Sequence, residues 1–267
     1  MEQPKNNFKI VSDKKARMIL PNALTLIGVC IGLSSIKFAL DSKFELSIIA
    51  IIVAAVFDGL DGRIARLIKG TSKVGKELDS LTDVISFGVA PAFIMYFWSL
   101  KNLGKFGWLL CLIYVVCVTL RLARFNIHSN TEPSWRDNFF EGVPSPAGGI
   151  IVLMPLIFSL SELDIFNVNY NLIVPIFFIT TSFLLISKFP TYSLKRIVIP
   201  RSMTIFLLFG IVLFFGLLLI YTFKVIALSG LVYLSLIPIS FLHYQKIKKQ
   251  KNIGVIKDES EDLEDIL

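Results

Sequence analysis

The stretch "FDGLDGRIARLIKGTSKVGKELDSLTD", residues 57–83, places four aspartates between long apolar segments. Asp58 and Asp61 are three residues apart and share one face of a helix, while Asp79 and Asp83 are four apart and share a face of the next helix. The "GTS" break between the two pairs lets the chain turn back, so we expect the four carboxylates to meet. Burying a carboxylate at membrane depth costs several kcal/mol, which favours a functional role.

The composition is that of a membrane protein. Of 267 residues, 54% are hydrophobic and 18% charged, and the mean hydropathy is +0.71, whereas about one quarter of a soluble domain is charged. A membrane-spanning helix needs about 20 apolar residues. We therefore predict an all-α, polytopic membrane helix bundle of about eight transmembrane helices, near residues 20–40, 44–68, 79–98, 106–123, 145–161, 171–188, 203–221 and 224–243.

Lys and Arg gather in alternate loops between the apolar runs. Cytoplasmic loops of membrane proteins carry this excess, so both termini and the aspartate stretch are expected on the cytoplasmic side. The same clustering explains the net charge of +7 without a nucleic-acid partner. The expected organisation is a cytoplasmic N-terminal segment, a membrane core, a C-terminal transmembrane hairpin and a charged cytoplasmic tail, at 1–19, 20–200, 201–245 and 246–267. The acidic end of the tail, "KDESEDLEDIL" (257–267), is expected to lack regular structure.

Four close carboxylates repel one another, so either some stay protonated or cations neutralise them. Hard oxygen ligands suit Mg²⁺, Mn²⁺ or Ca²⁺, and Mg²⁺ usually binds one or two carboxylates together with substrate phosphates. Gly62 and Ala65 leave room for a bulky group, and the Arg66 guanidinium suits phosphate. Two alternatives stay open on these grounds: surface charges at helix ends, and an ion or proton pathway.

The stretch resembles the signature of the CDP-alcohol phosphatidyltransferases, D-x-x-D-G-x-x-A-R, eight residues, then G-x-x-x-D-x-x-x-D. The resemblance implies a six-helix core followed by the C-terminal hairpin, and a reaction in which an alcohol attacks the β-phosphorus of a CDP-linked lipid and releases CMP. The implied general base is Asp83. The implied metal ligands, for two Mg²⁺ or Mn²⁺ ions, are Asp58, Asp61, Asp79 and Asp83, and the implied CDP-binding residues are Gly62, Ala65, Arg66 and Gly75, with Asn22 and Thr25 of the first helix.

Three further stretches resemble the phosphatidylserine synthase branch of this family: "LRLARFN" (120–126), "GVPSPAGG" (142–149) and "FPTYSLKR" (189–196). The implied substrates are CDP-diacylglycerol and L-serine. A serine carboxylate needs a cation, although each available cation could instead anchor a helix end among lipid headgroups. The candidate serine-binding residues are Arg121, Arg124, Asn126, Lys195 and Arg196, with Arg124 and Lys195 the preferred pair.

The resemblance further implies an integral membrane enzyme, expected in a bacterial inner (cytoplasmic) membrane, that contacts membrane lipid and forms a homodimer. Two alternative functions are carried forward. Another family member would use glycerol 3-phosphate or an inositol phosphate as acceptor, and a divalent-cation transporter would release no CMP.

Overall fold

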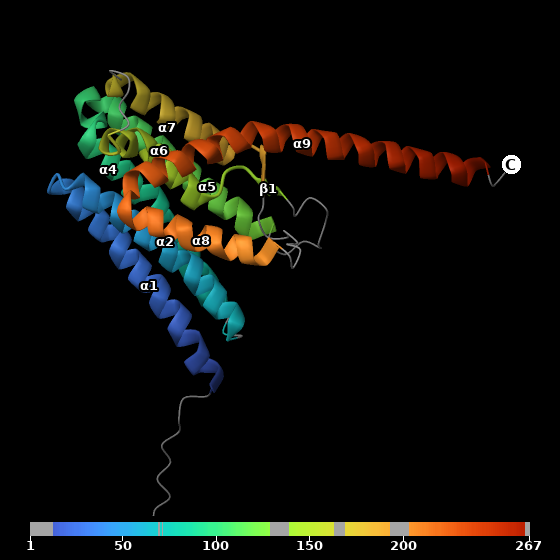
Figure 1. Ribbon diagram of the computed structural model, residues 1–267, viewed down its shortest axis with the longest axis horizontal. Helices are drawn as coiled ribbons and strands as arrows, with labels where there is room; N and C mark the ends of the chain where they lie inside the picture. Colours follow the sequence, from blue (N-terminus) through green and yellow to red (C-terminus); the bar gives the residue numbers. More distant parts are fainter. Residues whose placement is uncertain are drawn as a thin grey trace, which may run out of the picture.

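A computed structural model of the chain describes residues 13–68, 70, 72–128, 139–162, 169–192 and 203–264. These residues form a bundle of helices with one small antiparallel ribbon (Figure 1). The helices are α1 (Asp13–Leu40), α2 (Phe44–Leu67), α3 (Lys73–Asp83), α4 (Ala90–Trp98), α5 (Lys105–His128), α6 (Ser145–Leu160), α7 (Tyr170–Ile186), α8 (Thr204–Ile220) and α9 (Thr222–Glu264). A π-helical segment, η1 (Val84–Val89), joins α3 to α4, and a 3₁₀ turn (Leu100–Leu103) precedes α5.

Four described stretches are long and apolar enough to cross a membrane: Ile19–Leu40, Lys73–Trp98, Lys105–Ile127 and Thr222–Ile247. The apolar helices α6, α7 and α8 are shorter, with 16, 17 and 17 residues. The helical membrane bundle is therefore confirmed. Eight separate spans and the side of each terminus stay predictions.

Two predicted boundaries are wrong. The third helix was predicted to begin at residue 79 but begins at Lys73, because the Ser72 hydroxyl accepts a hydrogen bond from Gly75 N (2.9 Å) and caps a polar first turn. The acidic end of the tail, predicted to lack structure over 257–267, is helical as far as Glu264, and Figure 1 shows α9 running far beyond the bundle. The tail is rich in Lys and Glu, which are good helix formers.

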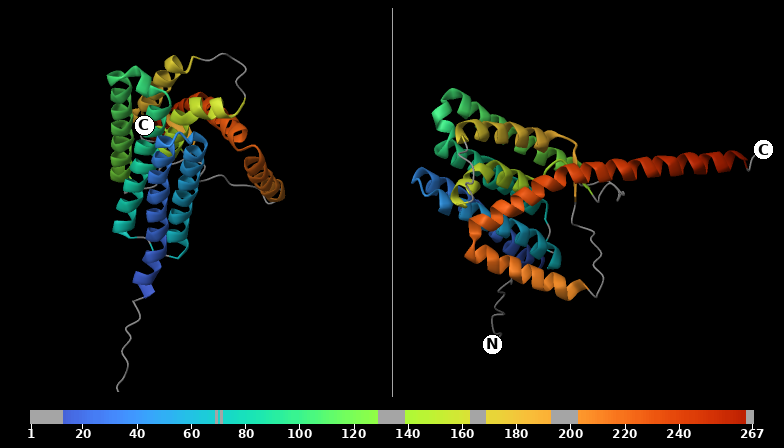
Figure 2. Two further views of the ribbon diagram at one scale, coloured as in Figure 1. Left: turned by 90° about the vertical axis from the view of Figure 1, so that its left-hand side faces the viewer. Right: turned by 45° about the horizontal axis from the view of Figure 1, so that its top comes forward.

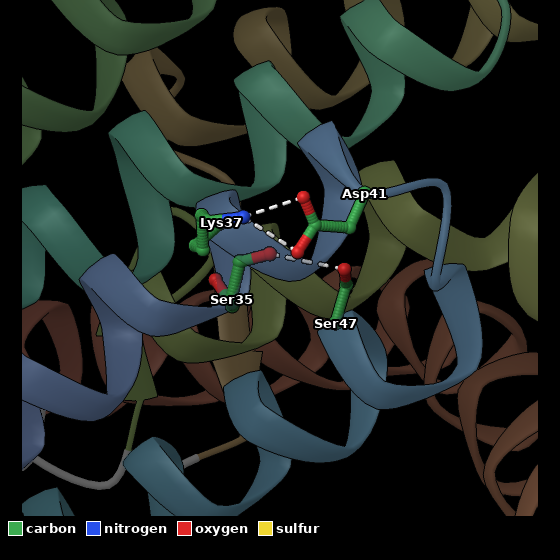
Figure 3. Close-up of polar contacts among 4 residues, drawn as sticks. All are labelled: Ser35, Lys37, Asp41 and Ser47. Carbon is green, nitrogen blue, oxygen red and sulfur yellow. Dashed lines mark hydrogen bonds and ion pairs between the residues drawn. The ribbon is translucent and has the colours of Figure 1, made fainter.

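A tight turn joins α1 to α2 at the end away from the aspartates (Figure 3). Lys37 Nζ donates to both carboxylate oxygens of Asp41, at 2.5 and 2.6 Å. Ser47 Oγ donates to the Ser35 carbonyl oxygen across the two helices (3.0 Å), and Ser42 adopts a left-handed backbone conformation, with φ of 58°. These contacts set α1 alongside α2, and the views of Figure 2 show the two helices as neighbours.

The segment η1 packs against α1, α5 and α6 inside the bundle. The Phe87 side chain is fully buried, and its carbonyl oxygen accepts a hydrogen bond from the buried Tyr114 hydroxyl of α5 (2.7 Å). The backbone of α1 also comes close, because a Cβ added at Gly32 would lie 3.2 Å from the Ser86 Cα. A π-helical turn inside an α-helix is rare and frequently marks a functional site.

The helical bundle agrees with the predicted all-α fold, and one small ribbon of two strands is added to it. Strand β1 (Phe139–Glu141) pairs antiparallel with β2 (Pro190–Tyr192), and Phe139 lies opposite Tyr192. Gly142, with φ of 77°, extends the ribbon by donating its N–H to the Phe189 carbonyl oxygen (2.8 Å). Strands of three residues leave no periodic signal in a sequence. The ribbon joins the stretches 142–149 and 189–192, and α9 packs against β2 and α6.

Candidate active site

Three of the four aspartates form a compact acidic cluster where α2 and α3 meet. One carboxylate oxygen from each of Asp58, Asp61 and Asp79 lies within 4.8 Å of the other two. Asp61 is almost fully buried, and the other two are partly buried. Three converging carboxylates offer the hard oxygen ligands that Mg²⁺ and Mn²⁺ prefer. The arrangement fits a divalent cation, while its identity and the presence of two ions stay predictions.

Asp61 is oriented by the first helix. Thr25 is buried on α1, and its hydroxyl lies 2.5 Å from Asp61 Oδ2, to which it donates, and 3.0 Å from the Pro21 carbonyl oxygen. This contact leaves the second Asp61 oxygen for a cation. The structure thus places Thr25 against a candidate metal ligand, and its direct contact with a nucleotide stays a prediction.

Asp83 lies on the other side of the cluster and belongs to a buried hydrogen-bonded chain. Ser145 Oγ, at the start of α6, donates to Asp83 Oδ2 (2.9 Å) and accepts from Arg121 Nη1 of α5 (2.9 Å). Asp83 Oδ1 is buried and has no hydrogen-bond partner among the described residues. The Asp58 carboxyl group adjoins that of Asp83. Asp83 therefore borders the acidic cluster, with the Asp58 carboxyl group within reach of its own.

A cavity of about 480 Å³ opens beside the acidic cluster between α1, α2 and α3. It contains five of the six predicted CDP-binding residues, Asn22, Thr25, Gly62, Ala65 and Gly75. Arg66 is not among the residues that line it, since its side chain turns back and Nε donates to the Gly62 carbonyl oxygen (3.1 Å).

Sequence reasoning missed two lysines of this cavity. Lys73 and Lys76 line it together with Asp61 and Asp79. Their position on either side of Gly75 was the available signal, because a helix turn that approaches a phosphate also presents its neighbouring cations. The cavity thus combines carboxylates for a cation with ammonium groups for an anion.

Parts of the first two further stretches meet beside Asp83, and the described part of the third pairs with the segment that leads into Ser145. Arg121 is buried and reaches the site through Ser145. Arg124 Nη1 instead donates to the Ile186 carbonyl oxygen at the end of α7 (2.7 Å), and Asn126 Nδ2 donates to Ser80 Oγ on α3 (2.8 Å). Lys195 and Arg196 lie outside the described residues. Of the four predicted cations, the structure thus brings Arg121 into the hydrogen-bonded chain of Asp83.

Comparison with known proteins gives consistent matches. The family model for CDP-alcohol phosphatidyltransferase matches residues 18–186. A CDP-diacylglycerol–serine O-phosphatidyltransferase of Mycobacterium leprae is 36% identical over 233 residues, which cover 85% of this chain and 76% of that protein. Proteins of the same name from Mycobacterium bovis and Helicobacter pylori are 39% and 40% identical, over 69% and 51% of this chain and 64% and 56% of their own lengths.

Proposed function

We propose that this chain, which belongs to the CDP-alcohol phosphatidyltransferase family, is an integral membrane enzyme that makes phosphatidylserine. It transfers the phosphatidyl group of CDP-diacylglycerol to the hydroxyl of L-serine and releases CMP. The names of the similar proteins support the serine acceptor. One structural observation carries the proposal: the acidic cluster and the nucleotide-sized cavity adjoin Asp83, which has one unpartnered buried oxygen among the described residues.

In the proposed reaction, Asp83 Oδ1 accepts the proton of the serine hydroxyl. The freed oxygen attacks the β-phosphorus of CDP-diacylglycerol, a new P–O bond forms, and the bond to the CMP oxygen breaks. Ser145 holds the other Asp83 oxygen (2.9 Å), so the carboxylate keeps its orientation during proton transfer. A positioned base contributes about 10²- to 10⁴-fold to a rate.

The acidic cluster serves the donor substrate. Asp58, Asp61 and Asp79 would hold divalent metal, Mg²⁺ or Mn²⁺, which supplies charge neutralisation at the pyrophosphate. Lys73 and Lys76 offer further positive charge where they line the cavity. The pairing of carboxylates with lysines explains how one site binds both a metal and a phosphate.

Arg121 is the proposed partner of the serine carboxylate. It is buried, it approaches Asp83 through the single hydroxyl of Ser145, and its Nε has no hydrogen-bond partner among the described residues. One hydroxyl separates the base from the cation, which suits a molecule as small as serine. A phosphate-bearing acceptor would favour a denser group of cations.

The test is CMP release by the purified protein in detergent with CDP-diacylglycerol and Mg²⁺ or Mn²⁺. Parallel reactions contain L-serine, glycerol 3-phosphate, inositol phosphate or no acceptor. We expect release that needs both serine and metal and yields a serine-containing lipid. Release with another acceptor alone would refute the serine assignment, and no release from folded protein would refute the transferase and favour the cation transporter.

A further inference from the structure

Helix α9 lies outside the stretch that the family model matches, yet it packs against the acceptor side of the site. It contacts α6 and strand β2, and Figure 1 shows it crossing the bundle next to the ribbon. Ile237 of α9 is buried against Val143 and Ile151, and Tyr233 packs on this cluster. The α9 side chains thus cover the segment that leads into Ser145.

The Tyr233 side chain packs on the cluster that contains Val143, two residues before Ser145, and the Ser145 hydroxyl accepts a hydrogen bond from Arg121 Nη1. The electrostatic influence of Arg121 and Thr191 on Tyr233 is consistent with this placement. Thr191 is held in place, because its hydroxyl donates to the Gly142 carbonyl oxygen (2.8 Å). The Tyr233 oxygen itself is buried, and none of the described residues forms a hydrogen bond with it that satisfies normal geometry.

Of the eight buried polar atoms without a hydrogen-bond partner among the described residues, three belong to Asp83 (Oδ1), Arg121 (Nε) and Tyr233 (the hydroxyl). Such atoms are uncommon in folded proteins, because an unsatisfied buried donor or acceptor is destabilising. As a set they comprise one proton acceptor, one cationic donor and one neutral donor. A hydroxy acid has a matching group for each, a hydroxyl for Asp83 and a carboxylate for Arg121 and Tyr233.

We propose that Tyr233 of α9 binds the carboxylate of the acceptor amino acid together with Arg121, and so determines acceptor specificity from a helix beyond the matched family region. The inference rests on the proposed function, because it takes the acceptor to be a hydroxy amino acid. The proposal assigns α9 a direct part in substrate selection, whereas the sequence indicated no function for this helix.

The test compares Tyr233→Phe, which removes the hydroxyl and keeps the packed ring, with Tyr221→Phe, the same change at an exposed tyrosine between α8 and α9. Losing one hydrogen bond to a charged group weakens the binding affinity by about 10- to 150-fold. We expect Tyr233→Phe to raise the KM for L-serine about 10-fold or more, with the KM for CDP-diacylglycerol within about twofold. Tyr221→Phe should leave both values unchanged.

A second substrate separates recognition from a structural defect. Serinol has the hydroxyl and amine of serine but no carboxylate, so it makes no use of Tyr233. Tyr233→Phe should therefore reduce the preference for serine over serinol by the same factor as it raises the serine KM. An unchanged preference, or equal losses on both acceptors, would overturn the proposal.

Calorimetric titration of L-serine into the protein with CDP and Mg²⁺ keeps the two proposals distinguishable. Serine binding without CMP release would refute the transferase. The Tyr233 proposal would then stand or fall on whether Tyr233→Phe raises the Kd for L-serine. If wild type uses another hydroxy acid, only the serine function falls and the KM for that acid tests Tyr233, whereas use of an acceptor without a carboxylate would overturn both proposals. Wild-type protein that neither binds nor uses a hydroxy acid would overturn both proposals.

Discussion

Replacing Ser145 with alanine should uncouple Asp83 from Arg121 while leaving the donor cavity intact. The Ser145 hydroxyl is fully buried and makes two hydrogen bonds of 2.9 Å, one to each charged partner. In the Ser145→Ala variant, Asp83 loses the contact that orients it, or it moves to pair directly with Arg121. Either outcome weakens Asp83 as a base.

The expected size of the effect follows from the loss of the Ser145–Asp83 hydrogen bond. A hydrogen bond to a charged group contributes about 1.5–3 kcal/mol, which corresponds to about 10- to 150-fold in rate at about 1.4 kcal/mol per tenfold. We expect kcat to fall within this range. The KM for CDP-diacylglycerol should stay within about twofold, because Ser145 does not line the donor cavity.

The assay is steady-state CMP release with both substrates varied. Asp83→Asn, which removes the base itself, gives the lower limit of the rate. Ser34→Ala is the matched control, because Ser34 is exposed and its hydroxyl bonds only within its own helix, to the Cys30 carbonyl oxygen (2.7 Å). A Ser145→Ala kcat within twofold of wild type, from protein that elutes and melts like wild type, would refute the positioning of Asp83 by Ser145.

Two other predictions concern the donor side. In Gly75→Ala the new Cβ would lie 2.8 Å from Asn22 Oδ1, so Asn22, which lines the donor cavity, must move and the KM for CDP-diacylglycerol should rise. Gly59→Ala, whose new Cβ meets no atom within 4 Å, is the control. Equal KM values in the two variants would contradict the reasoning. Asp58→Asn should raise the metal concentration that gives half-maximal activity at least about 10-fold, since even residues that only support a metal ligand change metal affinity by about 10–100-fold. The measurement removes bound metal with a chelator and then adds Mg²⁺ or Mn²⁺ back in steps. A half-maximal concentration equal to that of wild type would remove Asp58 from the metal site.

The sequence predicted the helices well where apolar runs have clear ends. The runs at 44–68 and 145–161 correspond to α2 (Phe44–Leu67) and α6 (Ser145–Leu160) within one residue at each end. The spacing of the aspartates likewise predicted that α2 and α3 would bring carboxylates together, as the cluster of three confirms. These features depend on local periodicity, which a sequence displays directly.

The parts that escaped prediction depend on contacts between distant segments. Arg121 and Arg124 differ by less than one helical turn, and only the packing of α6 and α7 directs one to Ser145 and the other to the Ile186 carbonyl. Tyr233 gave no signal, since an aromatic residue in an apolar run is also expected to face lipid. The ribbon of β1 and β2 was missed because each strand has three residues.

The π-helical segment that follows Asp83 has a consequence for insertions and deletions. A π-helix closes its hydrogen bonds one residue later than an α-helix, so Val84–Val89 holds one residue more than a regular helix would need there. Deleting one of these residues should therefore let α3 and α4 join as a regular α-helix that keeps Asp79 and Asp83 in about the same orientation relative to α4. If the segment kept all its residues and rewound as a regular α-helix, the aspartates would instead turn by about 100° relative to the buried face of α4. The π-helical turn thus keeps the aspartates of α3 and the buried face of α4 in phase despite the extra residue.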